Sequence, residues 1–323
     1  MGKKRVFCLL VTFFLSLIFL SETWAAEKFP SREIQLVVGN PPGGFMAIAV
    51  QIISENLGKN LGVPVVVTYK PGGGGATGIT FLTKSKPDGY TIGSISSADV
   101  VLLPATIPGV PFKYSEVDPL CKFFSSPNGV FCKGDSPWKT LEDLVADAKK
   151  RPGQITYGAT TNSISHLLME IFLKTAGIQM LHVPTQAAGE TITRILGGNL
   201  DLGVVALAPL VGQLKAGAVR GLFLTTSERV GTFPQIPTLK ELGYHAPVLN
   251  LYTGFYAPLG MPQPARETLT KALEKTIKDP SLKKKLEEVT LVLEYLPSEP
   301  FAKEIKEDYE RIAQFVKTMG PKK

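Results

Sequence analysis

A repeated order of residue types runs through much of the chain. A run of β-branched and other apolar residues leads into a turn rich in Gly, Pro and Ser and then into a run of helical composition, at residues 34–62, 63–85, 156–177 and 200–217. Strands that alternate with helices predict an α/β chain with largely parallel sheets. In such sheets ligands bind at the carboxyl ends of the strands, where the turns open helices.

The carboxyl-terminal part has a different pattern, because residues 264–319 are mostly helical in composition. An apolar stripe in this part predicts packing against a core and consists of Leu269, Leu273, Ile277 and Leu282. Ser298, with a proline two residues later, predicts the start of a capped helix.

The amino end has the three-part pattern of a secretory signal peptide. Lys3, Lys4 and Arg5 precede an apolar run at residues 6–20, and a short polar stretch with small residues follows. The apolar run is shorter than the roughly 20 residues of a membrane-spanning helix. We expect cleavage after Ala25, which makes residues 1–25 the signal peptide, and a periplasmic mature protein that is free in solution.

Length and charge narrow the class of protein further. The mature length of about 300 residues is enough for two domains of roughly 100 to 200 residues each, with a cleft between them. The whole chain has a formal charge of +7, and the signal peptide removes two of these, so the mature chain carries about +5. Basic residues near the carboxyl end are interleaved with acids, which is typical of a solvated helix face and predicts no nucleic-acid partner.

The mature chain keeps two cysteines, Cys121 and Cys132, on either side of the turn-forming residues SSPNG. A symmetric hairpin about that turn would place the cysteines opposite each other, where a disulfide is conceivable. Two free buried thiols are the alternative. Neither cysteine has a neighbour in sequence that indicates catalysis.

Two turns between a strand and a helix carry groups that suit an anion. Residues 41–47, PPGGFMA, offer main-chain amides at a helix start with little side-chain obstruction. Residues 159–165, ATTNSIS, offer hydroxyl or amide donors from Thr160, Thr161, Asn162, Ser163 and Ser165. The simpler interpretations are a plain turn for the first and a helix cap for the second. Facing each other across a cleft, the two turns would bind a small anion through neutral donors.

The glycine-rich segment from Gly73 to Gly78 fits the GxGxxG spacing of dinucleotide sites, and Asp99 lies at about the distance of the ribose-binding acid. The preceding strand is not the first of the chain, however, so a turn that allows close backbone approach is the favoured interpretation. Catalysis has less support still. His166, His182 and His245 have no ligand-type residue at metal spacing, and no motif of a catalytic nucleophile or zinc site occurs. We therefore expect no catalytic residue, no metal and no cofactor, and interpret His166 as a packing or capping residue.

Taken together, the segments resemble the Bug family, the extracytoplasmic binding proteins of tripartite tricarboxylate transporters. The resemblance runs in order over nearly the whole mature chain and is carried by PSREIQLVVGNPPGG, VPVVVTYKPGGGGATG, KPDGYTIG, TLEDLVADAKKRPGQITYGA, HVPTQAAGETITRILGGNLDLG, RGLFLTTSERVGTFPQIPTLKELGY and FYAPLGMP. It implies an α/β, two-domain periplasmic binding protein fold of type II-like form, each domain a central sheet flanked by helices, with the ligand in the cleft between them.

The resemblance also implies where the chain crosses between domains. The crossings would fall near residues 125–128 and 244–249, so that residues 26–125 plus 248–323 form domain 1 and residues 126–247 form domain 2. The last helix would belong to domain 1. Closure of the domains about these crossings is the expected motion.

Site residues follow from the resemblance position by position. The predicted ligand-binding residues are Pro42, Gly43, Gly44, Phe45, Met46, Ala47, Ser96, Ser97, Thr160, Thr161, Asn162, Ser163, Gln186, Ala187 and Ala188. The chain departs from the usual family pattern at several of them. Ala47 stands where an Asp is common and Gln186 where a Lys is common, while Thr160 and Asn162 stand where glycines are common. These departures favour a less charged ligand than a standard dicarboxylate, such as an aromatic or amide-bearing acid.

The sequence thus predicts a monomeric receptor, not an enzyme, that captures a small carboxylate or related organic acid and delivers it to the membrane subunits of a transporter. A ligand-sensing protein that serves a signalling partner is the first alternative. An enzyme that binds a dinucleotide at the glycine-rich turn is the second.

Overall fold

The computed structural model describes residues 29–42, 45–161, 163–226, 228–244, 250–288 and 293–319. The predicted signal peptide lies outside them. Within the described residues no helix is long and apolar enough to cross a membrane.

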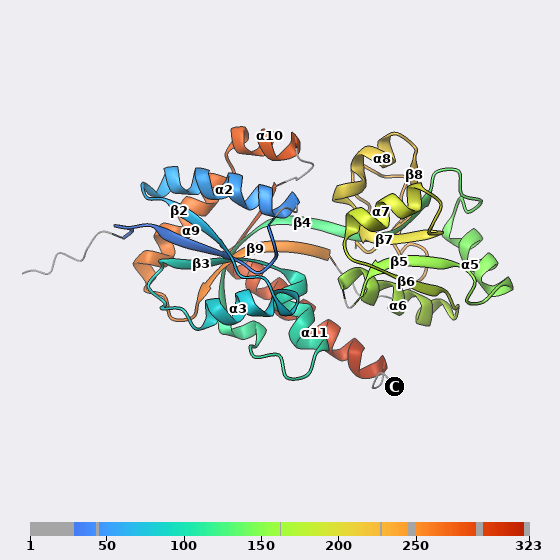
Figure 1. The fold of residues 1–323 in the computed structure, drawn as a ribbon, viewed down its shortest axis with the longest axis horizontal. Helices are drawn as coiled ribbons and strands as arrows, with labels where there is room; N and C mark the ends of the chain where they lie inside the picture. Colours follow the sequence, from blue (N-terminus) through green and yellow to red (C-terminus); the bar gives the residue numbers. More distant parts are fainter. Residues whose placement is uncertain are drawn as a thin grey trace, which may run out of the picture.

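In the described residues, ten strands form two joined sheets, each flanked by helices (Figure 1). The strands are β1 (Ile34–Val38), β2 (Val65–Tyr69), β3 (Thr91–Ser96), β4 (Val117–Lys133), β5 (Thr156–Thr160), β6 (Leu181–Thr185), β7 (Leu202–Ala206), β8 (Val219–Leu224), β9 (Asn250–Pro258) and β10 (Leu293–Pro297). The first sheet has the order β2-β1-β3-β9-β4-β10, and the second has the order β8-β4-β7-β5-β6. Strands β1 to β3 are parallel to one another, as are β5 to β7. Both sheets are mixed rather than largely parallel, because β4 and β9 run against their neighbours.

Each sheet carries helices on both faces. The helices are α2 (Phe45–Leu61), α3 (Ala76–Thr83), α4 (Leu103–Thr106), α5 (Leu141–Lys150), α6 (Ile164–Ala176), α7 (Ala188–Leu196), α8 (Val211–Lys215), α9 (Gln263–Ile277), α10 (Pro280–Glu288) and α11 (Ser298–Met319). Short helical turns lie at η1 (Gly73–Gly75), η2 (Ala98–Leu102), η3 (Tyr114–Glu116) and η4 (Ala208–Leu210). In Figure 1 the first sheet and its helices lie side by side with the second, and β4 runs from one to the other.

The predicted apolar stripe at the carboxyl end is confirmed. Leu269, Leu273 and Ile277 of α9 are fully buried in one core with Ile53 and Leu57 of α2. This core covers one face of the first sheet, and α11 packs on β4 at the other face. Strand β10, between α10 and α11, was not predicted, because its five residues are flanked by segments of strongly helical composition.

The hairpin predicted around SSPNG is wrong, because β4 is one continuous strand of 17 residues. It pairs with β9 as far as Pro127 and with β7 from Asn128 onward. Pro127 and Gly129, which have the composition of a turn, lie where β4 changes its neighbouring strand. Proline lacks the N–H that a central strand needs, and a Cβ on Gly129 would lie 2.5 Å from the carbonyl oxygen of Phe223.

The two cysteines are consequently far apart on β4, and both are buried free thiols. At about 3.3 Å per residue, the 11 residue steps from Cys121 to Cys132 along β4 separate their Cα atoms by roughly 36 Å, whereas a disulfide needs roughly 7 Å or less. Of the two alternatives, the structure has the free thiols.

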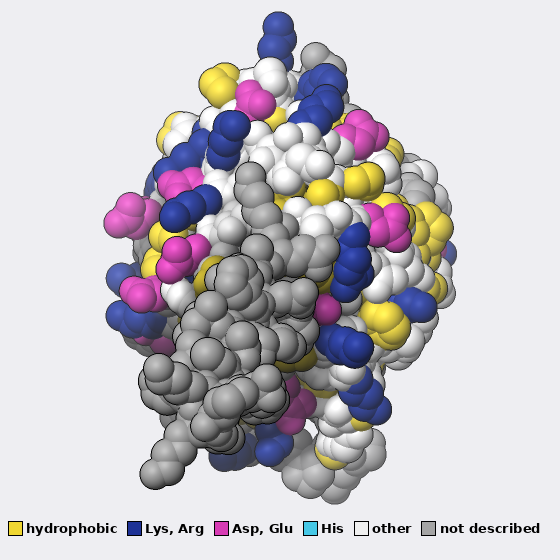
Figure 2. Space-filling model, turned by 90° about the vertical axis from the view of Figure 1, so that its left-hand side faces the viewer, with side chains coloured by type: hydrophobic (Ala, Val, Ile, Leu, Met, Phe, Trp, Pro, Cys, Tyr) yellow, Lys and Arg dark blue, Asp and Glu magenta, His cyan; other side chains and the backbone are white. Residues whose placement is uncertain are grey.

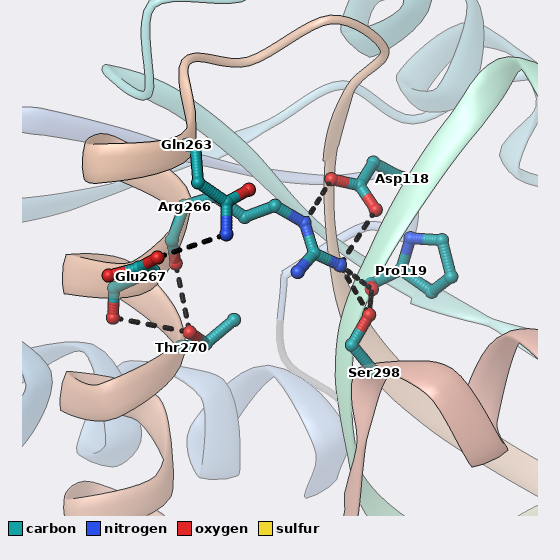
Figure 3. Close-up of polar contacts among 7 residues, drawn as sticks. All are labelled: Asp118, Pro119, Gln263, Arg266, Glu267, Thr270 and Ser298. Carbon is teal, nitrogen blue, oxygen red and sulfur yellow. Dashed lines mark hydrogen bonds and ion pairs between the residues drawn. The ribbon is translucent and has the colours of Figure 1, made fainter.

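Helix α11 begins at Ser298, as predicted. The Ser298 hydroxyl, however, bonds to residues outside α11. It donates to the carbonyl oxygen of Pro119 at 2.6 Å and contacts the Arg266 guanidinium (Figure 3). Arg266 in turn binds Asp118 through Nε at 2.8 Å and Nη2 at 3.1 Å. These contacts hold α9, β4 and the start of α11 together.

Charges on the outer face of the first sheet's region are mixed in sign. In Figure 2, Lys and Arg side chains lie among Asp and Glu side chains rather than in a patch of one sign. Exposed pairs at the end of α9, such as Lys278 with Glu274 at 2.6 Å, follow the interleaved pattern that the sequence predicted.

Candidate functional site: a pocket between the two sheets

A pocket of about 130 Å³ lies where β4 passes from one sheet to the other. Its polar lining consists of Asn128, Thr160, Ser163, Ser165 and Thr191. Its apolar lining consists of Ala98, Ile164, Ala188, Leu251 and residues 204–206 of β7. Ala98 of η2 and Leu251 of β9 belong to the region of the first sheet. The other lining residues belong to β4 and to the region of the second sheet, so the pocket lies between the two regions.

The loop between β5 and α6 forms one wall of this pocket. Ser163 caps α6, since its Oγ accepts a hydrogen bond from the His166 amide at 3.2 Å. The next two residues, Ile164 and Ser165, also line the pocket, and the first amides of a helix have no partner within the helix. This arrangement of main-chain N–H groups at a helix start suits a carboxylate.

The predicted residues of this loop are placed as follows. Thr160 is half-buried and lines the pocket with Ser163. Thr161 is exposed and is not part of the lining, and Asn162 lies outside the described residues.

Sequence reasoning missed Asn128, a buried polar residue of the lining. Asn128 is 2% exposed, and its Oδ1 accepts a hydrogen bond from the Ser165 hydroxyl at 2.9 Å. Its main-chain oxygen accepts from the amide and hydroxyl of Thr225 at 2.9 and 3.0 Å. The signal was present, since a polar residue within an apolar strand needs buried partners, but the hairpin interpretation placed Asn128 in a surface turn.

Three ligand-binding residues were predicted after β6, and of these only Ala188, the first residue of α7, lines the pocket. Gln186 and Ala187 are exposed, and neither is in the lining. The amide of Gln186 donates to Glu190 Oε2 at 2.7 Å, and Glu190 Oε1 pairs with Arg194 at 2.7 Å. Glu190 and Arg194 of α7 thus form an ion pair beside this loop.

The first predicted loop is described only in part. Pro42 is exposed, Met46 packs against the core under α2, and Ala47 is 8% exposed. None of these three lines the pocket. Gly43 and Gly44 lie outside the described residues, as does the side chain of Phe45.

The predicted pair Ser96 and Ser97 ends β3 and leads to η2. Ser97 is 3% exposed, and its hydroxyl donates to the carbonyl oxygen of Asn250 at 3.2 Å and accepts from the Tyr252 amide at 3.1 Å. That hydroxyl anchors the start of β9. The Ser96 amide donates to Asp99 Oδ2 at 3.4 Å. Burial raises the pKa of Asp99 to about 6, against the lowering effect of its hydrogen bonds to Ser96.

The glycine-rich turn follows the favoured interpretation, a close backbone approach. A Cβ on Gly78 would lie 2.6 Å from the Cα of Gly39, and one on Gly75 would lie 2.4 Å from Cγ of Asp99. The Asp99 carboxyl thus packs directly on the turn that a pyrophosphate would need. The preceding strand, β2, is also at the edge of its sheet rather than at its centre. The dinucleotide alternative has no support from this geometry.

Two of the histidines lie under the β5–α6 loop. The rings of His166 and His182 stack with centroids 4.1 Å apart, and His182 Nε2 lies 3.0 Å from the carbonyl oxygen of Ala159. His166 is therefore a packing residue, as predicted, and its amide donates to the capping hydroxyl of Ser163. His245 lies outside the described residues. Within the described part of the chain, no group of three or more His, Cys, Asp or Glu side chains is placed to hold a metal ion.

Two sheets flanked by helices, with a pocket of neutral groups between them, match the fold of two-domain periplasmic binding proteins. The sequence model described as "Tripartite tricarboxylate transporter family receptor" matches residues 48–320. The chain belongs to this family, whose members are periplasmic solute-binding receptors rather than enzymes.

Individual relatives agree with that assignment. A protein from the gbd 5′ region of Cupriavidus necator is 31% identical over 91% of this chain and 90% of its own length. Protein BugT of Bordetella pertussis is 30% identical over 73% of each chain, which confirms the resemblance to the Bug family.

Solved structures share the fold. The TctC solute-binding protein from Polaromonas has a TM-score of 0.78 at 24% identity and covers 90% of this chain and 99% of its own. MatC from Rhodopseudomonas palustris, solved with bound malate, has a TM-score of 0.74 at 21% identity and covers 89% of this chain and all (100%) of its own.

Proposed function

We propose that this protein is a periplasmic receptor that captures a small carboxylate between its two domains and delivers it to a tripartite tricarboxylate-type membrane transporter. The amino-terminal signal would direct its export. The domain boundaries would fall near residues 125 and 248, and no catalytic step would be needed.

The pocket between the sheets is the observation that carries this proposal. Its wall offers the α6 amides of Ile164 and Ser165 together with the hydroxyls of Thr160 and Ser163, all neutral donors suited to a carboxylate. The relative that holds malate shows the same fold with an organic acid bound. Other predicted residues, in the loops at residues 42–47 and 96–97, would close on the ligand from the other domain.

Isothermal titration calorimetry of the mature chain, residues 26–323, against mono-, di- and tricarboxylates tests the proposal. A ligand that binds only the folded state adds about 2.7 kcal/mol to stability at 100 times its dissociation constant, so a thermal melt gives an independent readout. We expect saturable binding of at least one carboxylate class.

A pair of variants locates the binding site. Ala188 is half-buried in the pocket lining, so Ala188→Phe would fill the pocket and remove binding. Ala146 of α5 is exposed and is not part of that lining, so Ala146→Phe is the matched control and would bind normally. Equal binding by both variants, or no binding of any carboxylate by the unaltered protein, would contradict the proposal.

Delivery needs a separate test. Uptake of the bound acid by cells that lack the native gene should return with the unaltered protein and with Ala146→Phe, but not with Ala188→Phe. Binding without any effect on uptake would indicate the signalling alternative.

A further inference from the structure

Three stacked rings lie beside the loop between β5 and α6 and outside the pocket itself. The His182 ring of β6 stacks on Tyr157 of β5 with centroids 5.1 Å apart and on His166 of α6 with centroids 4.1 Å apart. Tyr157 is fully buried, His166 is 9% exposed and His182 is half-buried. The stack thus joins the two strands and the helix that meet at this loop, and none of its rings is among the described lining residues of the pocket.

His182 holds the last peptide before the pocket. Its Nε2 lies 3.0 Å from the carbonyl oxygen of Ala159, and because a carbonyl oxygen can only accept, Nε2 carries the hydrogen. Ala159 is 1% exposed, and the next residue, Thr160, lines the pocket. The Ala159 carbonyl and the Thr160 amide belong to one planar peptide unit. The hydrogen bond from His182 therefore fixes the orientation of that unit at the edge of the pocket.

The stack also reaches the other end of the loop. The His166 amide donates to Oγ of Ser163 at 3.2 Å, and the Ser163 amide donates to the carbonyl oxygen of Thr160 at 3.1 Å. Thr160 and Ser163 both line the pocket. The two histidines therefore bond to both ends of this short turn, His182 through its ring and His166 through its main chain.

Glu170 of α6 contacts the rings on which His182 stacks. Its Oε1 accepts a hydrogen bond from the Tyr157 hydroxyl at 2.7 Å and lies 3.7 Å from His166 Nε2. These contacts, together with the stacking, leave His182 little freedom to turn its Nε2 away from Ala159. A binding site keeps its geometry when the side chains behind it are held in this way.

We propose that His182 is a positioning residue of the ligand site: its Nε2–H group holds the peptide between Ala159 and Thr160, and with it one wall of the pocket, in the geometry that receives a carboxylate. His182 acts through Ala159 and does not contact the ligand itself. This inference rests on the proposed function of the pocket as the ligand site. It gives His182 a role in affinity, in addition to packing.

Two substitutions separate the hydrogen bond from the packing. His182→Phe keeps a flat ring for the stack but removes the donor to Ala159, whereas His182→Gln removes the ring but keeps an N–H group that can reach the same carbonyl. We expect the Phe variant to bind its acid about tenfold more weakly than the unaltered protein, and the Gln variant to stay within about threefold. Stability should follow the opposite order, because the aromatic ring buries more apolar surface, so the Phe variant should unfold at the higher urea concentration.

Tyr157→Phe is the matched control. It removes the bond to Glu170, another hydrogen bond of the same stack, and leaves both the ring and the bond from His182 to Ala159 in place. This variant should bind the acid as tightly as the unaltered protein does.

Isothermal titration calorimetry with acetate, succinate and citrate, one acid from each class, measures the affinities, and urea denaturation measures the stabilities. Affinities that rank the two His182 variants in the order of their stabilities would show that His182 only packs. A Phe variant that binds as tightly as the unaltered protein would show the same. If the Phe variant did not fold, the Gln variant would decide, because a loss of about tenfold with the donor retained would contradict the inference.

The proposed function fails under different results. If none of the three acids binds the unaltered protein, or if binding survives Ala188→Phe, the pocket is not the carboxylate site and the inference fails with it. If Ala188→Phe removes binding while both His182 variants bind as the unaltered protein does, the pocket remains the ligand site and only the role of His182 is wrong.

Discussion

The two sheets use buried polar groups in different ways. At the first sheet they include, besides neutral groups such as Ser97, a charged and paired one: Lys122 of β4 is 4% exposed and binds Glu304 of α11 at 2.8 Å and Glu294 of β10 at 3.2 Å. At the second sheet the polar groups of the pocket are neutral, as in the bond between Ser165 and Asn128. A buried ion that loses its partner is costly, whereas a neutral donor can exchange one partner for another at modest cost. The first sheet is therefore suited to hold its helices and the second to bind and release a ligand.

Loss of the partner of the Lys122 charge should have the largest effect on stability. Glu304→Gln leaves the buried Lys122 ammonium with Glu294 alone, which is half exposed, and loss of one partner of a buried charge costs about 3 kcal/mol. Glu310→Gln is the control, because Glu310 pairs with Lys306 at 3.9 Å on the surface and such pairs contribute about 0.5 kcal/mol. Urea denaturation measures both changes. Equal losses would remove the contrast between the sheets.

The buried Asp99 predicts a smaller, pH-dependent effect. Burial raises its pKa to about 6, above the ordinary value of 3.8, so the folded state binds this proton more tightly than the unfolded state. Its contribution is fully favourable below about pH 4 and is lost as the pH rises through 6. At pH 7.5 the Asp99→Asn variant should therefore have a higher free energy of unfolding than the unaltered protein. This difference should be about 1.4 kcal/mol smaller at pH 5.

Asp143 of α5 provides the control for that titration. Hydrogen bonds from the amides of Lys139 and Thr140 lower the pKa of Asp143. Its stabilising contribution is present above the unfolded value and is lost only at lower pH, so Asp143→Asn should show no such trend between pH 7.5 and 5. A trend of the same size in both variants would rule out burial of Asp99 as its cause.

The neutral pair at the pocket should give the smallest of these energies. In a double-mutant cycle of Asn128→Ala and Ser165→Ala, the coupling energy in the ligand-free protein should be about 1 kcal/mol, the net value of one neutral hydrogen bond. Both single variants should also weaken carboxylate binding, because both residues line the pocket. A coupling near zero would mean that the bond does not hold the pocket in shape.

Local patterns were enough to predict much of the fold. The four strand–turn–helix segments each contain a strand and a helical element in the predicted order, and the stripe at Leu269 and Leu273 is buried. These features depend on neighbours in sequence, through the period of apolar residues and the composition of turns.

Contacts between distant segments account for what could not be predicted. Pro127 and Gly129 have the composition of a turn, but β9, β7 and β8 hold them in one strand. The same error hid Asn128 as a residue of the pocket. Ser97 was predicted only as a ligand-binding residue, whereas in the structure its hydroxyl bonds to Asn250 and Tyr252 of β9, which are 153 and 155 residues away in sequence.

A crystal structure of the mature protein grown with its tightest-binding acid tests the central claim most directly. The account predicts one carboxylate within hydrogen-bonding distance of the Ile164 and Ser165 amides, beside Thr160 and Ser163, with the body of the ligand against Ala188 and Leu251. A ligand bound instead at the glycine-rich turn from Gly72 to Gly75, or outside the space between the two sheets, would contradict it.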